Sequence, residues 1–83
     1  MRPGQAILVS LEPGGRIGRH PAMGEQCLVP LLGHAAVTGG AGGSSIVGPG
    51  EAVVWDAGED HETTTVDGLT ALVLEGVWER GPL

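Results

Sequence analysis

The chain is short and acidic, with 83 residues, four Lys and Arg against ten Asp and Glu, and a formal net charge of −6. This charge argues against nucleic-acid binding, because such binding draws its affinity from cations set against phosphates. No apolar run approaches the ~20 residues of a membrane-spanning helix. We therefore expect one soluble, cytoplasmic domain over residues 1–83, and with Cys27 as the single cysteine we expect no intrachain disulfide.

Eight short apolar segments, each closed by turn residues, predict an all-β fold. In chain order the expected strands are 5–11, 16–22, 26–32, 35–38, 44–47, 52–55, 61–66 and 69–75. Helical periodicity is not sustained over ten residues anywhere in the chain. Strands at this spacing indicate an antiparallel sandwich or barrel. Pro30 stands inside the third segment and removes a ladder hydrogen bond, so we expect that strand to be an edge strand or to contain a bulge.

Two histidines stand at fixed distances from glycines. His20 follows Gly14 after five residues, and Gly33 closes the same segment. This spacing and that of a second segment resemble the two motifs of the cupin superfamily. The second segment matches its motif without a gap at Gly50, Asp56, Gly58, His61 and Thr65, although Pro and Asn of the motif are replaced by Asp56 and Thr65. The resemblance covers most of the chain and implies a small antiparallel jelly-roll β-barrel.

The resemblance also implies a metal site, because cupins hold a divalent metal with three His and one Glu. Here Ala22 stands at the position of the second His and cannot coordinate a metal. Gln26 stands at the position of the Glu, and a neutral amide is a much weaker ligand than a carboxylate. Glu25 could substitute if a bulge turned it inward. A site for Fe, Mn, Ni, Cu or Zn would then draw on His20, His61, Gln26 and Glu25.

Strand alternation predicts a pocket around the two histidines. Residues two apart on a strand share a face, so Thr63 and Thr65 are expected beside His61. With His20 and Gln26 from the first motif, these residues form the predicted pocket: His20, Gln26, His61, Thr63 and Thr65. The threonines are equally well explained as good strand formers. The two histidines could also be polar barrel residues that bond each other or water.

Five neighbouring features have simpler readings. Trp55 is expected in the core, since the chain has only two aromatic residues, both Trp. Met23 is expected at the pocket mouth, either as filler or with a role in binding. His34 is expected at the surface, and Cys27 should face away from the pocket. The acidic residues within 56–62 are most simply a solvated turn that would raise the pKa of a nearby imidazole.

Three functions follow from this sequence. The first is a module that binds a small molecule around His20 and His61, with or without a metal. The second is a metal-dependent enzyme of the dioxygenase or isomerase type with a reduced ligand set. The third is a dimerising scaffold with a decayed site and a closed pocket. In each case we expect a homodimer, because an exposed edge strand and a small core favour pairing with a second copy.

Overall fold

The computed structural model describes residues 4–40 and 43–76, which form eight strands and no helix. Their ends differ from the predicted ends by at most two residues, so the predicted all-β fold is confirmed. The strands are β1 (Gln5–Leu11), β2 (Arg16–Pro21), β3 (Glu25–Gly33), β4 (Ala35–Thr38), β5 (Ser44–Val47), β6 (Val53–Trp55), β7 (Asp60–Thr64) and β8 (Leu69–Gly76).

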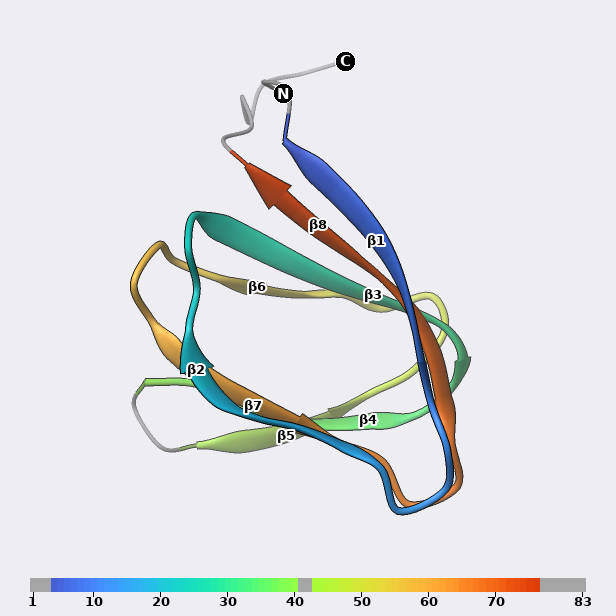
Figure 1. Cartoon of the computed structure of the whole chain (residues 1–83). Helices are drawn as coiled ribbons and strands as arrows, with labels where there is room; N and C mark the ends of the chain where they lie inside the picture. Colours follow the sequence, from blue (N-terminus) through green and yellow to red (C-terminus); the bar gives the residue numbers. More distant parts are fainter. Residues whose placement is uncertain (1–3, 41–42, 77–83) are drawn as a thin grey trace.

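The strands form two antiparallel four-stranded sheets that face each other (Figure 1). The first sheet has the order β1-β8-β3-β6, and the second sheet has the order β2-β7-β4-β5. Most connections cross from one sheet to the other, and only β4 and β5 follow each other within a sheet. This crossing pattern confirms the predicted jelly roll.

The core lies between the two sheets and is built from small and aliphatic side chains. It consists of Leu28, Ala35, Val37, Val47, Trp55, Leu69 and Ala71. Because the chain has neither Phe nor Tyr, Trp55 is the one large aromatic group among the buried residues of the described ranges. Packing around Trp55 therefore holds the β6 end of the first sheet against the second.

A bulge accommodates Pro30 in β3, as the sequence predicts. The ladder between β3 and β8 shifts its register between Pro30 and Leu32. On its other side β3 pairs with β6 only from Gln26 to Leu28. Pro30 therefore lies beyond the end of that second ladder. The strand is interior to the sheet but has one free side at the proline.

The motif glycines make turns that other residues would strain. Gly14, Gly33, Gly50 and Gly58 all have φ between 79° and 88°, a region that costs an L-residue conformational energy. At Gly33 a Cβ atom would in addition collide with the carbonyl oxygen of Gly68. The Gly14 amide donates to the carbonyls of Thr65 and Val66 at 3.1 and 3.2 Å, which ties the β1–β2 turn to the end of β7.

Candidate functional site

A bulge in β2 places His20 opposite His61. In the ladder with β7, Ile17 pairs with Thr63 and His20 pairs with His61, so three steps on β2 match two on β7. The extra residue lies at Gly18–Arg19, and it lets both Ile17 and His20 face the interior although they are three apart. His20 Nδ1 lies 2.8 Å from the carbonyl oxygen of Gly18, so the ring bonds the backbone of the bulge itself.

The two imidazoles form a compact aromatic group with Trp55. The ring centroids of His20 and His61 are 4.4 Å apart, with an edge-to-face angle of 65°. Trp55 stacks on the His61 ring: the two ring centroids are 4.1 Å apart, and the angle between the ring planes is 12°. His61 is only 2% exposed. Trp55 therefore does more than fill the core, because it fixes the plane of the buried His61 ring.

Backbone carbonyls set the tautomers of both rings. Nδ1 of His20 faces the Gly18 carbonyl, and Nδ1 of His61 lies 3.2 Å from the carbonyl oxygen of Glu59. A carbonyl can only accept a hydrogen bond, so each Nδ1 must carry a proton. In the neutral ring Nε2 then keeps its lone pair and acts as an acceptor or as a metal ligand.

Burial disfavours the protonated form of His61. Desolvation is the main cause that lowers the pKa of His61, and the neighbouring charge of His20 lowers it further. The hydrogen bond to the Glu59 carbonyl and the carboxylates of Glu59 and Asp60 act in the opposite direction without reversing the shift. Two carboxylates of the expected acidic turn thus contribute in the predicted direction, toward a higher pKa of His61, but desolvation outweighs them and the pKa is lowered.

Gln26 is held by a carboxylate that the sequence analysis missed. Gln26 on β3 pairs with Glu75 on β8 in the ladder, and its Nε2 donates to Glu75 Oε1 at 2.8 Å. Because an ionised carboxylate only accepts hydrogen bonds, the NH₂ group of the amide must face Glu75. The carbonyl Oε1 of Gln26 is thereby turned away from Glu75. The two residues are 49 positions apart, so only the register of β3 against β8 reveals the pair.

A cavity of about 120 Å³ lies between the sheets at this point. Its polar lining is His20, Gln26, His61 and Thr63, which are four of the five predicted pocket residues. The structure places Thr65 elsewhere: its hydroxyl donates to the His34 carbonyl at 2.8 Å and accepts from the Gly68 amide at 3.1 Å, so it closes the turn after β7. The remaining walls are apolar or aromatic and consist of Ile7, Val9, Ile17, Leu28, Trp55 and Val73.

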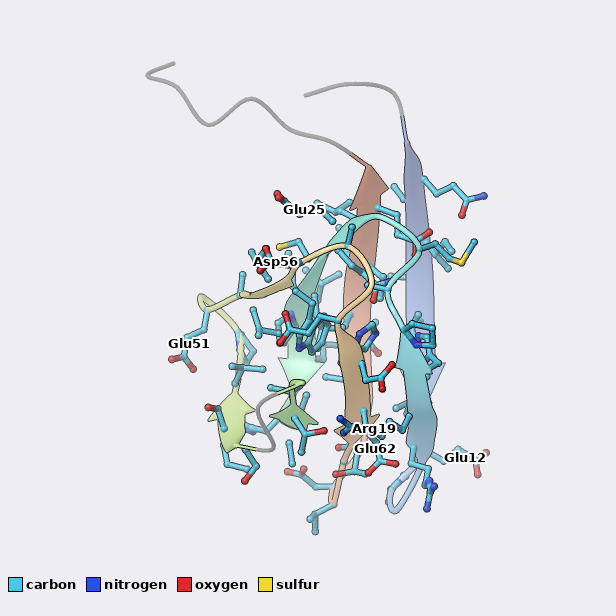
Figure 2. All side chains as sticks on the ribbon, turned by 90° about the vertical axis from the view of Figure 1, so that its left-hand side faces the viewer. Glu12, Arg19, Glu25, Glu51, Asp56 and Glu62 are labelled. Atoms are coloured by element: carbon cyan, nitrogen blue, oxygen red, sulfur yellow. The ribbon has the colours of Figure 1, made fainter. Side chains whose placement is uncertain are left out.

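The full cupin metal site does not assemble from these residues. Glu25 lies on the opposite face of β3 from Gln26 and points away from the interior (Figure 2). Ala22 is buried and offers only its backbone, which bonds Gly58 and Glu59. No group of three or more His, Cys, Asp or Glu that could hold a metal occurs within residues 4–40 and 43–76. What the site does offer is a pair of imidazoles.

The other singled-out residues lie outside the cavity. Met23 is 87% exposed, so its side chain projects into solvent beyond the predicted pocket mouth. His34 is exposed, as predicted, and packs against Gly48. Cys27 is partly buried and faces away from Gln26 on the neighbouring position of β3, also as predicted. The part of the chain that the structure describes contains no helix capable of crossing a membrane.

Comparison with known proteins rests on structure rather than on sequence. No family model and no curated protein match the sequence. A conserved protein of unknown function from Streptococcus pyogenes is 28% identical, with a TM-score of 0.77 over 89% of this chain. A DMSP lyase, DddQ, from Ruegeria pomeroyi is 29% identical over 94% of this chain, again with a TM-score of 0.77. A cupin superfamily protein from Desulfitobacterium hafniense is 14% identical over 94% of this chain, with the same TM-score.

These neighbours share the barrel but are longer. The chain spans 65% of the streptococcal protein, 41% of the lyase and 83% of the Desulfitobacterium protein. The two sheets, the motif glycines in their left-handed turns and the facing histidines agree with the resemblance seen in the sequence. The chain therefore has the fold of the cupin superfamily, whose members are its structural neighbours over most of its length.

Proposed function

We propose that the protein binds a small molecule in the cavity between His20 and His61. The observation that carries this proposal is the cavity itself, which has apolar walls and four polar side chains that converge on one space. Such a combination is typical of ligand sites, where apolar area supplies affinity and a few polar groups fix orientation. A cavity of ~150 Å³ accommodates a benzene ring, so the 120 Å³ found here suits a ligand of about five non-hydrogen atoms.

The polar groups have distinct parts in this proposal. His61 is buried and held between Trp55 and His20, so it is the most rigid contact for a ligand. Thr63 supplies a hydroxyl that can donate or accept. His20 sits on the bulge of β2, near the edge of the second sheet, and is the more exposed of the two rings. A ligand would therefore meet His20 on entry and His61 at the closed end.

The proposal is tested by binding measurements with a library of small fragments. We expect fragments of this size to raise the melting temperature of the wild-type protein and to shift the NMR signals of cavity residues. His61→Ala should abolish both effects. His34→Ala is the matched control, because this exposed histidine lies outside the cavity and its loss should leave binding intact. A library that shifts neither readout for the wild type would refute the proposal.

A metal-dependent enzyme is the second candidate, favoured by the two adjacent imidazoles. Both Nε2 atoms are available as ligands, since both Nδ1 atoms bond backbone carbonyls. The residues nevertheless do not fit the four-ligand site of the family, so no catalytic step is derived from it. Metal analysis of the purified protein decides: stoichiometric metal that disappears in His61→Ala would support the enzyme, whereas failure to bind metal on reconstitution would eliminate it.

The scaffold hypothesis is the weakest of the three. It predicts a barrel interior filled by side chains, with no space beside the histidines. The cavity that His20 and His61 line argues against this form of the hypothesis.

A further inference from the structure

We propose that the cavity selects a small organic cation, such as an alkylammonium ion, over an anion of the same size. This inference rests on the proposed binding function and names the chemistry of its ligand. It follows from the hydrogen-bond character of the cavity wall, which the surrounding backbone and Glu75 determine.

The polar wall consists mainly of acceptors. His20 and His61 each direct Nδ1–H to a backbone carbonyl, which leaves Nε2 as the acceptor of the neutral ring. Gln26 directs its NH₂ group to Glu75, so its carbonyl oxygen is the amide atom left to a ligand. Three fixed acceptors thus line one small space, and only the Thr63 hydroxyl can also donate. A primary ammonium group, with three N–H donors, matches this set.

The charges around the cavity favour the same ligand. None of its lining residues carries a permanent positive charge. The two arginines of the described ranges, Arg16 and Arg19, lie on the outer side of β2 and pair with Glu62 and Asp60 at 3.4 and 3.9 Å. The carboxylate of Glu75 lies directly behind Gln26. An anion entering this space would leave its own charge and the three acceptors unpaired, and each buried unsatisfied group weakens its binding.

Three probes of matched size test the inference: n-butylammonium, n-butanol and butyrate. Each is titrated into the labelled protein near pH 8, and Kd is measured from the NMR shifts of the Trp55 indole and of cavity amides. We expect butylammonium to bind about tenfold or more tightly than butyrate, with butanol between them. Equal or tighter binding of butyrate would overturn the inference and leave the binding function standing. If none of the three binds, the binding function fails together with the inference.

A pair of variants separates the wall chemistry from net charge. Glu75→Gln removes the carboxylate and frees the Gln26 amide to rotate, so the preference for the cation over the anion should fall by about fivefold or more. Glu12→Gln changes the net charge equally but alters an exposed residue of the β1–β2 turn, on the periphery of the molecule (Figure 2). That control should keep the wild-type preference. Equal losses in both variants would reduce the effect to overall charge and overturn the role of Glu75.

Discussion

Replacing Trp55 should loosen both the core and the histidine site. Trp55 is buried, belongs to the core cluster and stacks on His61 at 4.1 Å. Truncation of a buried Trp to Ala costs ~3–5 kcal/mol, and the lost aromatic stacking is part of that cost. A domain of 83 residues has a total stability of about 4–12 kcal/mol. Trp55→Ala should therefore remove a large share of the stability, and Trp55→Phe much less.

Two measurements on these variants check the argument. Urea unfolding gives the free energy of unfolding, with Trp55→Phe as the conservative control. NMR titration of the His61 ring gives its pKa, which desolvation lowers in the wild type. If Trp55 supplies part of that desolvation, the pKa of His61 should rise toward its usual value in a folded Trp55→Ala protein. A loss below ~1 kcal/mol together with an unchanged pKa of His61 would refute the assigned role of Trp55.

Three further predictions concern single residues. Because burial lowers the pKa of His61 below its ordinary value of 6.5, the unfolded chain binds the proton first as the pH falls. The stability should be complete above pH 6.5, fall between pH 6.5 and the folded-state pKa, and stay constant at the lower level below that pKa. His61→Gln should lose this dependence, as urea unfolding against pH will show. Gly33→Ala should destabilise more than Gly14→Ala in thermal unfolding, because both require positive φ but only the first collides with Gly68; equal losses would contradict this. Nitrogen NMR shifts near pH 8 should show protonated Nδ1 and bare Nε2 in both His20 and His61, and protonated Nε2 in either ring would remove the basis for the acceptor wall.

The strands were predictable because local signals define them. Alternating apolar residues and turn glycines act over a few positions, and they located all eight strands to within two residues. Pro30 was predictable for the same reason, since the missing N–H is a property of that residue alone. The position of β3 inside the first sheet could not be predicted, because it depends on the pairing of β3 with β6, which no local signal specifies.

The site was predictable only in part because it depends on register. Simple alternation would place Ile17 and His20 on opposite faces, and the glycine spacing identified His20 only through the family resemblance. Thr65 shares the alternation of His61, but it lies past the end of β7 in a turn, where its hydroxyl bonds the backbone. Glu75 was missed because its partner is reached through strand pairing across most of the chain.

The bulge in β2 shows that the chemistry of this barrel and its fold can vary separately. The extra residue at Gly18–Arg19 is what turns the His20 ring inward, and the ring in turn bonds the Gly18 carbonyl. Loss of one residue there would restore a regular ladder in which Ile17 and the histidine stand two apart and still share the inner face, so the imidazole would stay opposite His61 but would lose the bulge that its Nδ1 bonds. The core cluster, none of which lies on β2, would keep its packing. A one-residue deletion in this short segment can therefore change which proton-bearing nitrogen the His20 ring presents to the cavity without separating the two histidines or disturbing the scaffold.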